Sequence, residues 1–160
     1  MAPALAKEAA DKISEQLCLL SPSHIPTFQE QRAKLGQKLD SVDALIHDLL
    51  LPHKGKRFYV FHPAFGHFAS AYGLQQVAIE TEGHEPSPQE IVKLLEQVAD
   101  DEVRTLLVQP QFTAKEVETM ADELGAAIVE IDPLSPDYLQ NLVSTASRIA
   151  DALSVSKEQE

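Results

Sequence analysis

Between residues 57 and 131, four short apolar runs alternate with segments that carry the start and stop signals of helices. The runs are 57–61, 75–80, 104–108 and 126–131. Apolar runs of this length, each followed by a helix, are typical of buried parallel strands with helices on both faces. The sequence therefore predicts an α/β fold with a four-stranded parallel sheet and right-handed crossovers.

The helices between these runs have recognisable ends. Residues 87–90 read Ser-Pro-Gln-Glu, a capping box with proline at the first helical position, and residues 113–116 repeat the box as Thr-Ala-Lys-Glu. Ser135 and Pro136 are predicted to open the last helix. Gly125 is predicted to end the helix before the fourth run, because glycine adopts the left-handed conformation that stops helices.

Two helices are predicted before the α/β unit. Apolar side chains recur at three- and four-residue steps over 4–20 and again over 26–50, and Pro52 closes the second pattern. The second helix would be about 35 Å long, at ~1.5 Å per residue. A small α/β core does not need a helix of this length, which indicates a coiled-coil partner or a spine that supports a further part.

Composition excludes several classes of partner and site. The chain has 160 residues and a net charge of -12, so its field repels phosphate backbones and anionic membrane surfaces. We therefore expect no nucleic-acid partner. No stretch approaches the ~20 apolar residues that span a bilayer, and residues 1–20 are too charged for an export signal, so we expect no membrane insertion. The single cysteine, Cys18, allows no Cys-rich zinc cluster.

Candidate ligand-binding residues follow the strands, because open parallel sheets bind ligands beyond the carboxyl ends of their strands. His62 follows the first run and could present a ring nitrogen to a cleft, or be a hydrogen-bonded structural residue. Asp132 follows the fourth run and could be a rigid oxygen donor, or form an Asx turn. His84 is expected to be solvated, and Gln109 to satisfy loop backbone.

Catalytic signatures are absent from the sequence. It has no Gly-x-Ser-x-Gly elbow and no His-Glu-x-x-His motif. It also lacks the phosphate-binding motifs Gly-x-x-x-x-Gly-Lys and Gly-x-Gly-x-x-Gly. We therefore predict that the chain is not an enzyme.

Several linked motifs resemble one known family. Residues 58–66 read Phe-Tyr-Val-Phe-His-Pro-Ala-Phe-Gly, and they are followed by Ala-Tyr-Gly-Leu at 71–74, Glu-Pro-Ser at 85–87, Gln-Pro-Gln-Phe at 109–112 and Asp-Pro-Leu at 132–134. In order and spacing these motifs resemble the C-terminal lobe of the zinc/manganese solute-binding proteins of ABC transporters (cluster A-I type). The resemblance covers residues 53–153.

The resemblance implies a metal site shared between two α/β lobes that one long helix joins. By correspondence, His62 is the third ligand, which is histidine or glutamate in the family, and Asp132 is the fourth. Imidazole favours zinc over manganese, so zinc is the expected metal. Two departures are Pro63, which replaces a polar residue, and His67, which replaces an aromatic residue and is expected to pack rather than to bind metal.

The resemblance also implies how the chain is organised. Residues 1–52 correspond to the helical linker and spine, 53–153 to the metal-binding lobe, and 154–160 to a frayed polar tail. The expected partners are an importer permease and an N-terminal lobe that this chain lacks, in the periplasm or cell envelope. With at most two ligands, the isolated lobe should bind metal weakly or not at all.

A missing lobe would leave one face of the two N-terminal helices uncovered. Phe28, Leu35 and Leu39 are expected on that face, and burying a few such side chains would contribute several kcal/mol to association at about 25 cal/mol per Å². We therefore predict a homodimer through these two helices. The alternative function is that of a stand-alone dimerising remnant of the lobe without tight metal binding.

Overall fold

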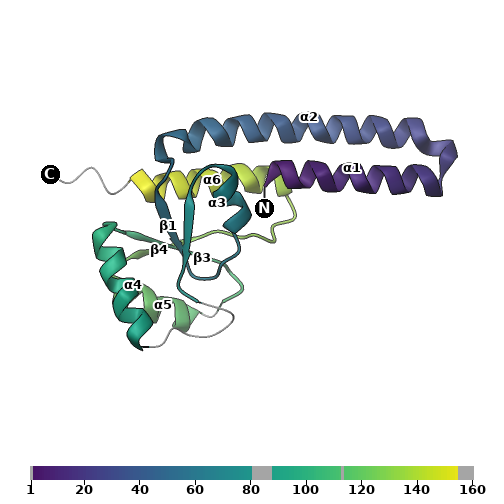
Figure 1. Cartoon of the computed structure of the whole chain (residues 1–160). Coiled ribbons are helices and arrows are strands. Elements are labelled where there is room, and N and C mark those ends of the chain that lie inside the picture. Colours follow the sequence, from purple (N-terminus) through teal and green to yellow (C-terminus); the bar gives the residue numbers. More distant parts are fainter. Residues whose placement is uncertain (1, 81–87, 113, 155–160) are drawn as a thin grey trace.

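A computed structural model describes residues 2–80, 88–112 and 114–154, and it consists of a helical hairpin joined to an α/β lobe (Figure 1). The hairpin is made by α1 (Pro3–Leu20) and α2 (Ile25–Leu50), with the short 3-10 turn η1 (Pro22–His24) between them. A second 3-10 turn, η2 (Leu51–His53), leads into the lobe. The predicted long helix is confirmed at 26 residues.

The lobe repeats a strand and a helix four times. Its elements are, in chain order, β1 (Arg57–Val60), α3 (Gly66–Ala71), β2 (Gln75–Ala78), α4 (Pro88–Asp100), β3 (Thr105–Val108), α5 (Ala114–Leu124), β4 (Ala127–Glu130) and α6 (Tyr138–Ser154). All strands are parallel, in the order β2-β1-β3-β4. The predicted α/β fold with a four-stranded parallel sheet is confirmed.

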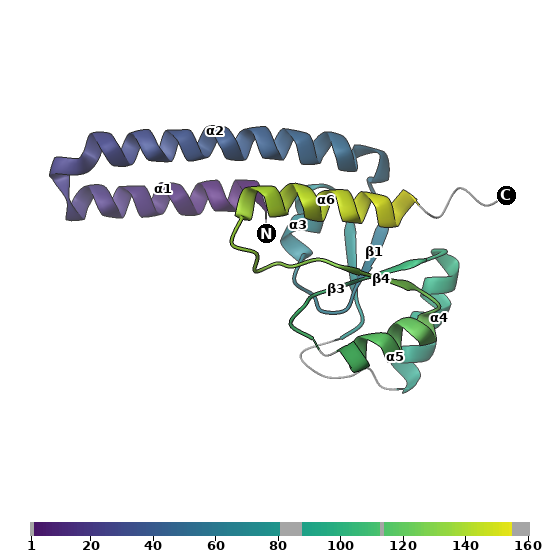
Figure 2. The same ribbon diagram turned by 180° about the vertical axis from the view of Figure 1, so that it is seen from behind.

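Helices cover both faces of the sheet, because strand side chains alternate between two apolar cores. Phe58 and Val60 of β1 point into a core shared with α2, α3 and α6. Tyr59 and Phe61 point into the opposite core, shared with α4 and α5. Figures 1 and 2 show α4 and α5 below the sheet and α2, α3 and α6 above it.

The hairpin joins the lobe through the second half of α2 and projects beyond it. Leu39, Ile46 and Leu50 are the buried residues of α2, and α6 packs along this half of the helix. α1 and α6 lie end to end beneath α2 (Figure 2). The prediction that Leu39 faces water is therefore wrong, because the start of α1 and α6 both pack here and leave Leu39 only 1% exposed.

Two local predictions have different outcomes. Gly125 follows the last residue of α5 with φ +63°, so the predicted helix stop is confirmed. The predicted start of the last helix at Pro136 is wrong, because α6 begins at Tyr138. The side chain of Asp137 accepts a hydrogen bond from the backbone N–H of Gln140 at 3.3 Å and takes the capping role. The two predicted capping-box residues Ser87 and Thr113 lie outside the described residues.

Candidate functional site

The candidate site lies at the edge of the sheet where the parallel strands end. His62 follows β1, Glu80 follows β2, Gln109 follows β3 and Asp132 follows β4. Because β3 lies between β1 and β4, the strands that carry His62 and Asp132 are two strand spacings, about 10 Å, apart.

The His62 ring is held in place by an acid from the neighbouring strand. Its Nδ1 lies 3.0 Å from Oε2 of Glu80, whose side chain is only 12% exposed. The ring also contacts Phe112, with 5.2 Å between ring centroids. A carboxylate accepts hydrogen bonds, so in the tautomer that makes this bond Nδ1–H is the donor and Nε2 keeps its lone pair. Histidine ligands of metals are commonly oriented by such a carboxylate.

The backbone of His62 is fixed by a buried amide at the end of β3. Oε1 of Gln109 accepts the His62 N–H at 3.3 Å, and Nε2 of Gln109 donates to the His62 carbonyl at 2.9 Å. Gln109 is 1% exposed, so both polar ends of its side chain are satisfied inside the protein. The prediction that this amide satisfies loop backbone is confirmed. Gln109 also ties the ends of β1 and β3 together.

The Asp132 carboxylate forms the predicted Asx turn and accepts a second bond. Its Oδ1 accepts the Leu134 N–H at 2.9 Å and the Gln111 Nε2–H at 2.9 Å. Its backbone carbonyl accepts a hydrogen bond from Nδ2 of Asn141 at 2.7 Å, which anchors the turn to α6. The carboxylate is therefore pre-positioned, and carboxylate ligands of metals are commonly held by hydrogen bonds in this way.

Glu80 is the site residue that the sequence reasoning missed. It stands at the end of the second apolar run, so the rule that directs attention to strand ends could have found it. The outcomes for the other candidates are mixed. His67 is exposed on α3, so the prediction that it packs is wrong. His84 lies outside the described residues.

Within residues 2–80, 88–112 and 114–154, no group of three or more His, Cys, Asp or Glu side chains could hold a metal ion. A nitrogen donor from His62 and an oxygen donor from Asp132 fit the chemistry of zinc, which accepts both. A closed zinc site takes about four protein ligands. The carboxyl edge of the sheet thus carries two side chains of types that zinc accepts as ligands.

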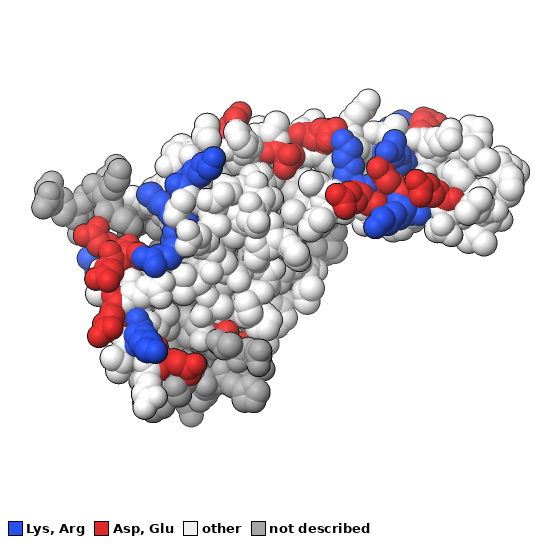
Figure 3. Space-filling model, in the orientation of Figure 1, with Lys and Arg blue, Asp and Glu red and all other residues white. Residues whose placement is uncertain are grey.

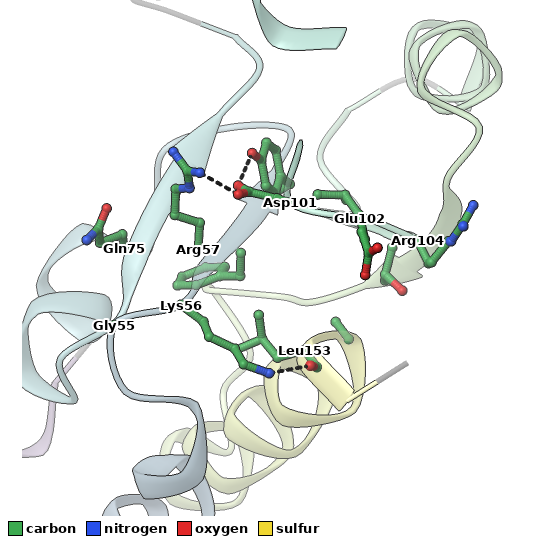
Figure 4. A pocket seen from close by; sticks show the side chains of 13 residues that line it. Gly55, Lys56, Arg57, Gln75, Asp101, Glu102, Arg104 and Leu153 are labelled. Carbon is green, nitrogen blue, oxygen red and sulfur yellow. Dashed lines mark hydrogen bonds and ion pairs between the residues drawn. The ribbon is translucent and has the colours of Figure 1, made fainter. Parts of the chain in front are cut away.

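A cavity of about 530 Å³ lies at the opposite edge, where the strands begin (Figure 4). Three of the polar side chains that line it bond to other parts of the chain. Arg57 forms an ion pair with Asp101, which also accepts a hydrogen bond from the Tyr59 hydroxyl at 2.6 Å. Burial, and then the Asp101 carboxylate, raise the pKa of Tyr59. Lys56 donates to the Leu153 carbonyl at 3.0 Å. These contacts connect β1, α6 and the α4–β3 turn, which assigns them to stability.

Comparison with known proteins agrees with the fold and with zinc chemistry. Residues 1–152 match the family described as zinc-uptake complex component A, periplasmic. A relative from Haemophilus influenzae, a high-affinity zinc uptake system protein ZnuA, is 28% identical over an alignment of 160 positions that covers 94% of this chain and 48% of the relative.

Solved structures give the same result. A crystal structure of ZnuA is 33% identical with a TM-score of 0.90, over 96% of this chain and 60% of that one. A zinc-bound deletion mutant of ZnuA is 34% identical with a TM-score of 0.87, over 94% of this chain and 58% of that one.

These matches define a class of protein, the zinc-uptake solute-binding proteins. This chain belongs to the family of zinc-uptake complex component A, since the match covers nearly all of its residues. It spans about half the length of the curated relatives it matches. The similar proteins are named for uptake and not for catalysis. No helix within the described residues is long and apolar enough to cross a membrane.

Proposed function

We propose that this chain is the C-terminal lobe of a zinc solute-binding protein of an ABC importer, in which His62 and Asp132 are metal ligands. The observation that carries the proposal is the bond between His62 Nδ1 and Glu80, because it leaves Nε2 as a zinc donor at the carboxyl edge of the sheet. The family match supports the choice of zinc as cargo. Under this proposal the chain has no enzymatic activity.

The ligand chemistry favours zinc over manganese. Zinc accepts imidazole nitrogen at about 2.0–2.1 Å and carboxylate oxygen at about 2.0–2.2 Å, whereas oxygen-rich sites suit manganese. Of the two proposed ligands one is an imidazole. Two ligands leave a tetrahedral ion half coordinated by protein, so zinc binding to a single copy of this chain should be weak.

The rest of the importer supplies the remaining proposed partners. The relatives are about twice as long as this chain, which supports an N-terminal lobe as the source of further ligands. In that arrangement α2 is the spine between the lobes, residues 53–153 are the C-terminal lobe and residues 154–160 a polar tail. The permease is then the membrane partner and the periplasm or cell envelope the compartment, as the family description supports.

A second candidate function, a stand-alone dimerising remnant without tight metal binding, is favoured by the exposed apolar side chains of the hairpin. Ile13 is 60% exposed and Leu20 81% exposed. Covering such side chains with a second copy through α1 and α2 would remove apolar surface from water. Zinc binding that depends on His62 and Asp132 separates the first function from this one.

The test is calorimetric titration of the metal-free chain with zinc. We expect affinity no tighter than micromolar for the monomer, and loss of the binding heat in His62→Ala and in Asp132→Ala. Glu80→Gln should weaken binding about 10- to 100-fold, because it removes the carboxylate that orients the imidazole. His47→Ala is the control, since that imidazole is also exposed and lies on α2. Zinc binding unchanged in the first two variants would overturn the proposal.

A further inference from the structure

The turn formed by residues 109–112 contacts both proposed ligands. Its sequence is Gln-Pro-Gln-Phe, and the Phe112 N–H donates to the Gln109 carbonyl at 3.3 Å, which closes a four-residue turn. Pro110 stands at the second position, where the fixed φ of proline matches the turn geometry. The turn directly follows β3, and β3 lies between the two strands that precede the ligands.

Two side chains of this turn hold His62. The buried amide of Gln109 binds both the backbone N–H and the backbone carbonyl of His62, at 3.3 Å and 2.9 Å. The Phe112 ring packs against the imidazole and also against Phe61, with 5.2 Å and 5.0 Å between ring centroids. The turn therefore fixes the backbone of His62 and limits the positions that its ring can take.

A third side chain of the turn, that of Gln111, holds Asp132. Its Nε2–H donates to Oδ1 at 2.9 Å, and the same oxygen accepts the Leu134 N–H at 2.9 Å. A carboxylate oxygen has about two lone-pair sites, so these two bonds occupy Oδ1. Within the described residues no hydrogen bond reaches Oδ2. Oδ2 is then the oxygen left for a metal, and Asp132 would fill one position of a tetrahedral ion.

Gln111 holds this carboxylate without neutralising it, because an amide is an uncharged donor. Asp132 forms no ion pair with a Lys or Arg of the described residues. In Figure 3, Lys and Arg lie over the hairpin and on the side of the lobe away from it. With Glu80 beside His62, the carboxyl edge carries two carboxylates whose field attracts a cation.

We propose that Gln111 is a positioning residue for zinc, which fixes Asp132 relative to His62 through the 109–112 turn. The proposal rests on the proposed function. No hydrogen bond joins the two ligands directly within the described part of the chain, and the turn contacts both of them. Ligand distances in a metal site are held within about 0.2 Å. Ligands that already lie in place need less reorganisation on binding, so the turn should raise the affinity for zinc.

The test is calorimetric titration of the metal-free 160-residue chain with zinc chloride, in the wild type and in Gln111→Met. Methionine is close to glutamine in length but cannot donate a hydrogen bond. We expect about tenfold weaker zinc binding in this variant. The urea midpoint of unfolding should not change, because Gln111 is exposed. Gln37→Met should alter neither value, since that glutamine is also exposed and lies on α2.

A measurement without metal tests the contact between the turn and Asp132. In nitrogen–proton NMR spectra of the metal-free chain, Asp132→Ala should shift the side-chain amide signals of Gln111, because it removes the oxygen to which that amide donates. The side-chain amide signals of Gln37 should stay in place. Unshifted Gln111 signals would overturn the proposal.

The outcomes separate this inference from the proposed function. Zinc binding that depends on His62 and Asp132 but is equally tight in Gln111→Met would overturn the positioning role and leave the proposed zinc-binding lobe standing. A urea midpoint that falls together with the zinc affinity would also overturn it, because the loss would then come from the fold. Absence of any zinc binding would overturn both proposals.

Discussion

The α/β lobe and the projecting half of the hairpin both contain apolar side chains, but only the lobe buries them in a core. The lobe buries side chains from every strand region into one of two apolar clusters. Among the described residues of α1, only Pro3 is buried, and residues 25–38 of α2 contain no buried residue. The lobe is stabilised by its own packing, whereas the projecting half of the hairpin is held mainly by contacts between α1 and α2.

This difference indicates which region would gain more stability if another surface covered it. An amphipathic helix that keeps its apolar residues in water loses the burial that normally stabilises it. Ion pairs between the helices, such as Lys7–Asp40 at 2.6 Å, are exposed and contribute little. The hairpin therefore gains most from a covering surface, and the lobe gains least.

The largest contrast is expected from apolar truncations in the two regions. Leu142 on α6 is fully buried, so Leu142→Ala should lower the free energy of unfolding by about 2–5 kcal/mol. Ile13→Ala, at a side chain that is 60% exposed, should change it by less than about 0.5 kcal/mol in the monomer. Urea denaturation at low protein concentration measures both. Equal costs for the two variants would remove the distinction between the regions.

Two glycines should respond with opposite signs. Gly125 has φ +63°, where a side chain is strained although its space is open, so Gly125→Ala should cost roughly 1 kcal/mol. Gly36 lies inside α2, and a methyl group there would meet only Lys7 at an ordinary 3.7 Å. Gly36→Ala should stabilise the chain by roughly 0.5–1 kcal/mol. Thermal melts of both variants check this, and a gain for Gly125→Ala would contradict the left-handed turn.

The smallest effect concerns acid stability at the junction of the two regions. Burial, with a smaller contribution from Lys56, lowers the pKa of His53 from its ordinary 6.5. His53 therefore takes up a proton at a higher pH in the unfolded chain than in the folded chain. The free energy of unfolding should fall as the pH drops below about 6.5 and level off below the pKa of His53 in the folded chain. His53→Leu should flatten part of this slope, and His47→Leu, at an exposed imidazole, should not. Identical slopes in both variants would contradict the assignment.

The sheet could be predicted from the sequence to within a residue or two at each strand end. Apolar runs such as 104–108 carry that information locally, and β3 occupies 105–108. The start of α6 could not be predicted in this way, because it depends on hydrogen bonds between residues that are not adjacent in the sequence. The Asx turn of Asp132 and the bond from Asn141 to its carbonyl hold the segment before Asp137 out of the helix.

The position of the candidate site at the strand ends was predictable, but the hydrogen bonds between its residues were not. His62 and Asp132 are identifiable because they follow strands, and the same rule points to Glu80. What the sequence cannot reveal is the strand order, which places β2 next to β1 and so brings Glu80 to His62. Burial of Leu39 was missed for a similar reason, because it depends on where α1 and α6 meet α2.

Anomalous scattering at the zinc edge, from crystals of this chain grown with zinc, tests the assignment of His62 and Asp132 most directly. We predict a peak at about 2.0–2.2 Å from Nε2 of His62 and from a carboxylate oxygen of Asp132. A zinc peak bound only at other histidines, such as His24 or His47, with none at the carboxyl edge of the sheet, would contradict the assignment.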